Sequence, residues 1–381
     1  MTLEAFSIEV SSLDQKCEAL RQEVREFLAV HLQNRPLREK AKNWSAADPE
    51  FSQQLGHRGW IGMVWPKEYG GHEKTALERY VVVEELLAAN APVAAHWPAD
   101  RQTGPLILKF GSEDMKRKIL PGVARGETYF CIGLSEPNTG SDLASLQTSA
   151  VRTDHGWVIN GTKVWTSLAH SSHYMVTLVR TSKGEKRQAG LSQFLIDMKT
   201  PGIGIRPILS LTGDHDFNEV SLVDVEVPHE AMIGEEGDGW KQVTAELAFE
   251  RSGPERYLTS SQLLLEMLAM SSVNDPRQAI ELGRVVAGYA TLRQMSLGIA
   301  TMLSRGENPA LAAALVKDLG AGIEQGMTEL AHHLFDAESA PIGSSLEEVA
   351  SYTTQLAPSY SIKGGSREIL RSIVARGLGM R

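Results

Sequence analysis

Residues 134–142, LSEPNTGSD, decide the fold when they are read together with residues 161–167, GTKVWTS. The first stretch leaves the apolar run 129–134 and enters a loop rich in hydroxyl groups, amides and glycine, whose backbone N–H groups can turn toward an anion or a ring heteroatom. The second stretch sets a flat aromatic side chain, Trp165, beside two hydroxyl groups. An indole can cover one face of an isoalloxazine ring while a neighbouring hydroxyl or N–H group meets a ring nitrogen. The two segments together therefore predict a flavin cradle.

In this order and at this separation, the two segments resemble the acyl-CoA dehydrogenase family of FAD enzymes. The resemblance covers nearly the whole chain. It includes the turn at 160–163, the segment 217–228, the loop 234–240 and the closing residues 373–379. A Ser-Glu-Pro loop alone also occurs in ordinary polar hairpins, so the ordered set carries the resemblance.

The bulk composition restricts the class of protein. A chain of 381 residues is too long for one simple core and suggests two or three packed subdomains. No apolar run reaches the ~18 to 20 residues that a membrane span requires, and residues 1–10 lack the features of a secretion signal. The two cysteines, Cys17 and Cys131, are too few for a disulfide framework or a zinc site. We therefore expect a cytoplasmic protein without a metal.

The net charge of −9 argues against nucleic acid as the main partner, although a local basic patch for the phosphates of CoA remains compatible with it. His170 and His173 suggest a metal pair at first sight, but no Cys or carboxylate follows at ligand spacing. We interpret them as a solvated turn.

Apolar residues recur at helical spacing in the first third of the chain and again after Trp240. The first third is expected to contain helices at 13–32, 51–58, 76–90, 103–110 and 112–122. The last third is expected to contain helices at 242–270, 276–306, 309–335 and 365–375.

Between these regions the sequence consists of short runs rich in Val, Ile, Thr and aromatic residues, separated by turn residues. This pattern predicts eight strands, at 129–134, 147–153, 156–159, 163–166, 174–180, 191–197, 203–207 and 219–227. Eight short strands suggest a small barrel or sandwich, and the family resemblance implies a mostly α protein with a central β-barrel. Its parts are an N-terminal helical domain (1–127), a small β-barrel domain (128–234) and a C-terminal four-helix bundle (235–381), the order of the family that the chain resembles.

The resemblance implies a reaction that takes a proton from the carbon alpha to a thioester carbonyl while hydride leaves the beta carbon for the flavin. Much of the family supplies the base as the Glu of a Tyr-Glu-Gly-Thr motif near the C-terminus, but Gly364 stands at that place here. A second family pattern supplies a Glu directly before an Arg on the first long helix of the bundle, and Glu250 and Arg251 match it. Glu250 is therefore the candidate catalytic base, with a surface ion pair as the alternative interpretation.

The other site residues follow from the same resemblance. Leu134 and Ser135 match positions on the pyrimidine side of the flavin, whereas Trp165 and Ser167 match positions at its face and N5. Gly140 belongs to the same cofactor loop, and Ser141 matches a position near a phosphate or the pantetheine of the substrate. Arg251 matches a place near the substrate channel or is an exposed helical Arg. A barrel-core aromatic and capped polar turns are the alternative interpretations of Trp165, Ser135 and Ser141.

Two family features are missing from the sequence. Residues 274–279 lack an Arg-x-x-Phe-Gly motif, and residues 334–339 lack the glycine-rich loop that contacts the FAD of a neighbouring subunit. Gly364, Gly365 and Ser366 can still bring backbone N–H groups close to a phosphate. The chain is expected either to bind FAD in a homo-oligomer, a dimer or tetramer, or to pair with a related subunit in a heterotetramer, as do family members acting on steroid side chains.

The leading functional hypothesis is an FAD-dependent acyl-CoA dehydrogenase that passes electrons to an electron-transfer flavoprotein. One alternative is a non-catalytic or half-site subunit that completes the flavin pocket of a partner. Another keeps the fold but passes the electrons to oxygen. The sequence leaves the acyl group open, because the pocket depends on helix packing.

Overall fold

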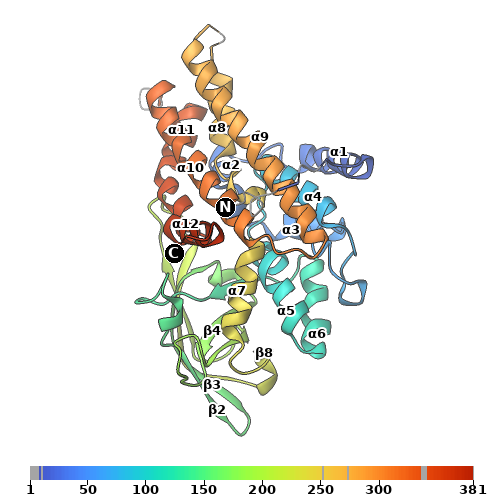
Figure 1. Cartoon of the computed structure of the whole chain (residues 1–381), viewed down its shortest axis with the longest axis vertical. Helices are drawn as coiled ribbons and strands as arrows, with labels where there is room; N and C mark the ends of the chain where they lie inside the picture. Colours follow the sequence, from blue (N-terminus) through green and yellow to red (C-terminus); the bar gives the residue numbers. More distant parts are fainter. Residues whose placement is uncertain (1–7, 10–11, 251–252, 273, 336–340, 381) are drawn as a thin grey trace. The chain divides into compact units, whose positions relative to one another are not determined.

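The structure, a computed structural model, describes residues 8–9, 12–250, 253–272, 274–335 and 341–380, without the side chains of residues 246–250 (Figure 1). The described residues form twelve α-helices and one eight-stranded sheet. The predicted class, mostly α with a central β region, is confirmed. The chain forms two compact units that are interleaved in the sequence. The three-domain division at 127 and 234 stays a prediction.

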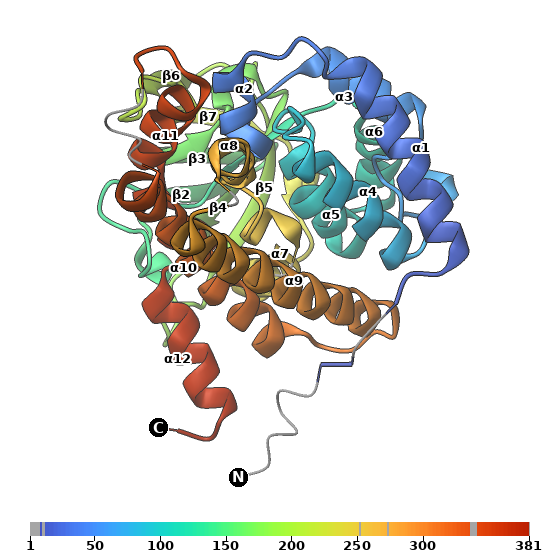
Figure 2. The same ribbon diagram turned by 90° about the horizontal axis from the view of Figure 1, so that it is seen from above.

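The first unit is helical and takes its residues from 1–47, 74–93 and 248–381. Its longest helices, α9 and α10, run side by side (Figures 1 and 2). Among the described helices, none is both long and apolar enough to cross a membrane. The helices are α1 (Gln15–His31), α2 (Leu37–Lys42), α4 (Ala76–Ala88), α8 (Ser261–Met270), α9 (Pro276–Ser304), α10 (Ala310–Leu334), α11 (Ser345–Leu356) and α12 (Arg367–Gly377).

The predicted single helix over 242–270 is wrong. The structure has α7 (Gly239–Glu250) and, separately, α8, with a 3-10 turn at Pro254–Arg256 between them. Proline has no N–H group to donate and its ring clashes with the preceding helical turn, so Pro254 prevents a continuous helix. The helices α2 and α11 were not predicted: the first has only six residues, and the second is rich in hydroxyl residues that weaken a helical signal.

The second unit, residues 48–73 and 94–247, contains the sheet together with α3 (Pro49–His57), α5 (Gly104–Phe110), α6 (Glu113–Ala124) and most of α7. The strand order is β6-β7-β3-β2-β4-β5-β8, and β1 pairs with β4 in parallel. The strands are β1 (Phe130–Gly133), β2 (Ser149–Thr153), β3 (Gly156–Ser167), β4 (Tyr174–Arg180), β5 (Leu191–Asp197), β6 (Ile203–Ile208), β7 (Phe217–Val227) and β8 (Met232–Ile233).

The two strands predicted at 156–159 and 163–166 are one strand, β3, and β8 was not predicted. Gly161 separates the two predicted runs and has the character of a turn residue. In the structure it lies at a register irregularity within β3, with φ 153°, where a Cβ atom would meet Thr148 Oγ1 at 2.4 Å. Glycine here allows close approach of two chain segments without ending the strand.

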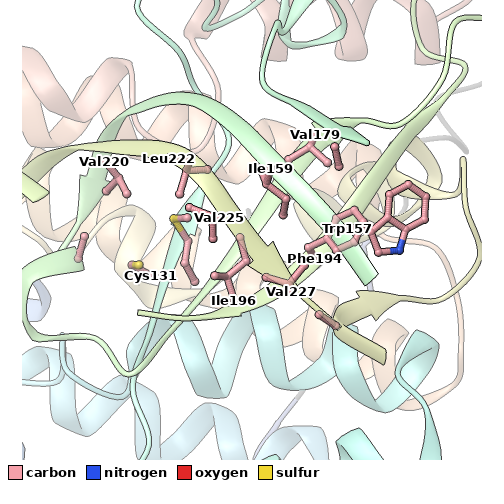
Figure 3. Packing of buried hydrophobic residues seen from close by; sticks show 14 residues of the cluster. Cys131, Trp157, Ile159, Val179, Phe194, Ile196, Val220, Leu222, Val225 and Val227 are labelled. Carbon is pink, nitrogen blue, oxygen red and sulfur yellow. The ribbon is translucent and has the colours of Figure 1, made fainter. Parts of the chain in front are cut away.

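Apolar side chains from several strands fill the interior of the sheet unit (Figure 3). The Trp157 and Phe194 rings meet edge to face, with centroids 5.4 Å apart. Cys131 lies in this core, and burial raises the pKa of its thiol to about 12. The other cysteine, Cys17 of the helical unit, is also buried, which raises its pKa to about 11.

Gly320 sets how closely α10 packs on the turn that follows α7. A Cβ atom at Gly320 would lie 2.0 Å from the carbonyl oxygen of Arg256, whereas one at Gly326 of the same helix would meet nothing within 4 Å. We expect Gly320→Ala to lower the free energy of unfolding by ~1–3 kcal/mol through overpacking. The matched control Gly326→Ala should raise it by ~0.5–1 kcal/mol, because alanine is the better helix former. Urea denaturation measures both changes, and equal effects at the two positions would contradict this account.

Candidate active site

The loop after β1 is fixed by its own backbone. The N–H group of Glu136 donates to the carbonyl of Thr139 at 2.8 Å, and the N–H group of Thr139 donates back to the carbonyl of Glu136 at 3.1 Å. The tip between them, Pro137 and Asn138, is exposed. This closed turn holds the loop in one shape while its outer residues remain accessible.

A buried ion pair ties this loop to β3. Lys163 Nζ lies 2.9 Å from Glu136 Oε1 and donates to the Leu134 carbonyl at 3.1 Å. The Glu136 carboxylate also accepts the backbone N–H groups of Gln147 and Thr148, at 2.6 and 2.8 Å. The pair therefore joins three separate stretches of the chain.

The charges of this pair are controlled by burial and by each other. Burial lowers the pKa of Lys163 to about 8, against the attraction of Glu136. Burial alone would raise the pKa of Glu136, but the Lys163 charge and the hydrogen bonds from Thr148 and Gln147 outweigh it and hold that pKa below its usual value. Both groups are therefore charged at neutral pH.

The backbone of β3 bulges at Trp165. Lys163 pairs with Val220 and Thr166 pairs with Asn218, so β3 has one more residue than β7 over this interval. Trp165 has φ 59°, a left-handed conformation that costs ~1–3 kcal/mol in a residue other than glycine. Its side chain is 60% exposed and meets the Phe217 ring edge to face, with centroids 6.0 Å apart. The strained backbone thus presents a large flat ring at the surface of this unit.

The structure brings the predicted flavin residues of this unit together. The N–H group of Val164, next to Trp165, donates to the carbonyl of Ser135 at 2.9 Å, which joins the loop to the bulge. Leu134 and Ser135 are partly exposed, and Ser167 is exposed on the same strand as Trp165. Gly140 and Ser141 are exposed farther along the loop, and a Cβ atom at Gly140 would meet nothing within 4 Å.

Two hydroxyl groups in these segments have unused hydrogen-bonding capacity that a bound polar ring could satisfy. Thr139 Oγ1 and Thr166 Oγ1 are buried and have no hydrogen-bond partner among the described residues. Buried polar groups in proteins are normally satisfied, so such orphans indicate a place for a ligand atom or a water molecule. The donor set therefore fits the flavin that the sequence predicted. The sequence prediction did not single out Glu136, Lys163, Thr139 or Thr166, although all four lie inside the segments that it quoted.

The remaining predicted residues belong to the helical unit. Glu250 is the last residue of α7, and its side chain is outside the described set; Arg251 also lies outside the described residues. Gly364 and Gly365 have φ 74° and 108°, and Ser366 is the N-cap residue of α12. These glycines give the turn a conformation that other residues rarely adopt.

A side chain at Gly364 would crowd the neighbouring Arg256. A Cβ atom there would lie 2.9 Å from Nη1 of Arg256, which is 3% exposed and forms an ion pair with Glu255. This buried guanidinium occupies the space into which a residue at position 364 would project. A side chain at 364 would therefore require the Arg256 guanidinium to shift, in addition to a φ of 74° that residues other than glycine rarely adopt. Among the described residues, no cluster of three or more His, Cys, Asp or Glu side chains could hold a metal ion.

Comparison with known proteins identifies the family. Residues 14–127 match the family model "Acyl-CoA dehydrogenase, N-terminal domain", and residues 131–225 match "Acyl-CoA dehydrogenase, middle domain". The chain is 36% identical over 343 residues to the acyl-CoA dehydrogenase IpdE1 of Mycobacterium tuberculosis, which covers 87% of each protein. The chain belongs to the acyl-CoA dehydrogenase family. The enzyme class expected from the sequence, an oxidoreductase, is thereby confirmed for this acyl-CoA dehydrogenase.

Further similarities extend to a longer relative and to solved structures. The acyl-CoA dehydrogenase FadE34 of M. tuberculosis is 34% identical and matches 87% of this chain, which spans 46% of that relative. The structure described as "Tcur3481-Tcur3483 steroid ACAD" has a TM-score of 0.85 and 27% identity, covering 97% of this acyl-CoA dehydrogenase and 99% of that chain. The ChsE4-ChsE5 complex from M. tuberculosis has a TM-score of 0.84 and 29% identity, with the same coverage.

The buried ion pair yields a test. Glu136→Gln leaves Lys163 buried without a counter-charge, so we expect a loss of ~3–5 kcal/mol in the free energy of unfolding. Since the pKa of Glu136 is lowered, its stabilisation in the natural protein is lost as the pH falls below the ordinary value of 4.5, and the variant should lack this part of the acid dependence.

Glu219→Gln is the matched control for Glu136→Gln. Its partner Arg206 is largely exposed, so the control should change stability by only ~0–1 kcal/mol. Denaturant unfolding at several pH values measures both variants. An equal loss of unfolding free energy in the two variants would show that the buried pair stabilises the protein no more than the exposed pair.

Proposed function

We propose that this acyl-CoA dehydrogenase uses FAD to desaturate an acyl-CoA thioester between its alpha and beta carbons, with Glu250 as the base. The observation that carries the proposal is the joined loop and bulge, where Ser135 and Val164 are hydrogen-bonded beside Trp165. When bound, FAD would accept the hydride that leaves the beta carbon. Leu134, Ser135, Gly140, Ser141, Trp165 and Ser167 would hold it, and Gly364, Gly365 and Ser366 would offer backbone N–H groups to it.

Glu250 is supported as the base by its match to the family pattern of a Glu directly before an Arg on the first long helix of the bundle. The competing position, 364, is a glycine with φ 74° against the Arg256 guanidinium. Glu250 would take the alpha proton of the thioester, and Arg251 would lie near the substrate.

The relatives support a substrate class and an assembly to test first. The similar structure Tcur3481-Tcur3483 is called a steroid ACAD. Its description and that of the ChsE4-ChsE5 complex each name a pair of proteins. We therefore propose an acyl-CoA with a bulky, ring-containing acyl group as the substrate. We also propose assembly with further subunits, either copies of this chain or a related one, and an electron-transfer flavoprotein as the electron acceptor.

A half-site subunit is the second candidate function, favoured by the missing motifs at 274–279 and 334–339. The purified chain decides between the two. Yellow protein that is bleached by acyl-CoA under anaerobic conditions supports the dehydrogenase. Protein that is colourless alone and yellow only after co-expression with a related chain supports the half-site subunit.

Glu250→Gln should keep bound FAD but lose at least ~10²-fold in the rate of flavin reduction by acyl-CoA, because the general base is gone. Anaerobic stopped-flow absorbance measures the rate. The control Glu236→Gln, at an exposed position just before α7, should reduce at the natural rate. An unchanged rate in Glu250→Gln would remove Glu250 from the role.

The double variant Glu250→Gln/Gly364→Glu tests whether the C-terminal position can replace the base. We expect no recovery of flavin reduction, since a side chain at 364 meets the Arg256 guanidinium and requires an unfavourable φ. Recovery of more than ~10-fold over Glu250→Gln would show that position 364 is open to a catalytic carboxylate after all.

A further inference from the structure

The cross-strand partner of the bulge is a buried asparagine. Asn218 of β7 is fully buried and pairs with Thr166, the residue between Trp165 and Ser167. Its Nδ2 donates to the Thr166 carbonyl at 3.0 Å. A single side-chain amide therefore holds the middle of the segment that carries the predicted flavin contacts.

Two histidines fix this asparagine from the other side. Asn218 Oδ1 lies 2.8 Å from Nε2 of His215 and 3.3 Å from Nδ1 of His170. Because the amide nitrogen is engaged by Thr166, the oxygen is the acceptor and the imidazole N–H groups are the donors. The two rings stack with centroids 4.0 Å apart at 25°. Partial desolvation, together with the interaction with His215, lowers the pKa of the His170 imidazole, whose side chain remains exposed.

A second anchor lies just beyond Ser167. Leu168 has φ 53°, another left-handed residue, and its N–H group donates to the carbonyl of Asp216 at 2.9 Å. Two left-handed residues thus flank Thr166 and Ser167. Such conformations persist where the surroundings over-determine them, and Asn218 supplies the central bond.

We propose that Asn218, fixed by the stacked His170 and His215, is the positioning residue that presents Trp165 and Ser167 to the flavin. The proposal rests on the proposed function for the identity of the ligand only. The sequence predicted that His170 and His173 lie in a solvated turn, and both are exposed; the His170 ring also stacks on His215, 45 residues later.

The test uses the full chain with 5-fluorotryptophan, in which the Trp165 fluorine resonance is assigned by its loss in Trp165→Phe. In Asn218→Ala this resonance should shift and broaden, with or without FAD. In the FAD-loaded enzyme, the maximal rate of flavin reduction should fall ~10- to 10²-fold, because the contacts are misplaced. The KM for acyl-CoA should change less than ~2-fold, because substrate contacts are retained.

Asn160→Ala is the matched control. Asn160 makes the same type of side-chain contact across β3 and β7 at the other register irregularity: its Nδ2 donates to Asp224 Oδ1 at 3.0 Å, and its Oδ1 accepts the Asp224 N–H at 2.9 Å. The variant should leave the Trp165 resonance and the reduction rate unchanged. His215→Ala and His215→Gln form a milder pair at a partly exposed position, and only glutamine keeps an N–H donor for Asn218.

We expect His215→Ala to show a weaker form of the Asn218→Ala effects and His215→Gln to restore the natural resonance. An unchanged Trp165 resonance in Asn218→Ala would overturn the proposal. A shifted resonance with an unchanged reduction rate in the loaded enzyme would overturn it as well. Failure of every variant and of the natural chain to bind FAD would count against the proposed function instead, and the fluorine resonance would still decide the role of Asn218.

Discussion

The site depends on two opposite charges buried together in the sheet unit, Lys163 and Glu136. Removing such charges from water is costly, and their attraction offsets this cost only when the remaining donors and acceptors are also satisfied. Here the carboxylate accepts hydrogen bonds from two backbone N–H groups, and the ammonium donates a hydrogen bond to a carbonyl. The pair fixes the loop against β3 at the residue where the regular ladder ends, so the bulge always begins at the same place.

The bulge changes which face of the strand Trp165 occupies. In a regular strand, side chains alternate between faces, and one extra residue reverses this alternation for everything that follows. The ladder alone does not hold the segment from 164 to 168. The N–H groups of Val164 and Leu168 also donate to the carbonyls of Ser135 and Asp216, and the Asn218 amide donates to the Thr166 carbonyl. Hydrogen bonds outside the regular ladder, on both sides of β3, therefore set the geometry of the predicted flavin contacts.

The sequence predicted those parts of the fold that depend on local patterns. The strands β4 and β5 have the bounds expected from their runs of apolar and β-branched residues, and α6, expected over 112–122, spans Glu113–Ala124. The pairing of Glu136 with Lys163 and of Asn218 with two histidines was not predicted. These contacts join residues far apart in the chain and depend on sheet register, which periodicity does not encode. The prediction of one helix over 242–270 overlooked Gly253 and Pro254, a helix-breaking pair in the stretch 250–256, which apart from the proline ring has no aliphatic or aromatic side chain.

The chain contains two cysteines, and both thiols are enclosed in apolar surroundings that keep them protonated. Only the thiolate form of a cysteine attacks electrophiles at a useful rate. A protein that works on acyl-CoA thioesters meets activated acyl groups at every turnover. With both thiols buried and their pKa values raised, neither sulfur atom is set up as a nucleophile toward such groups.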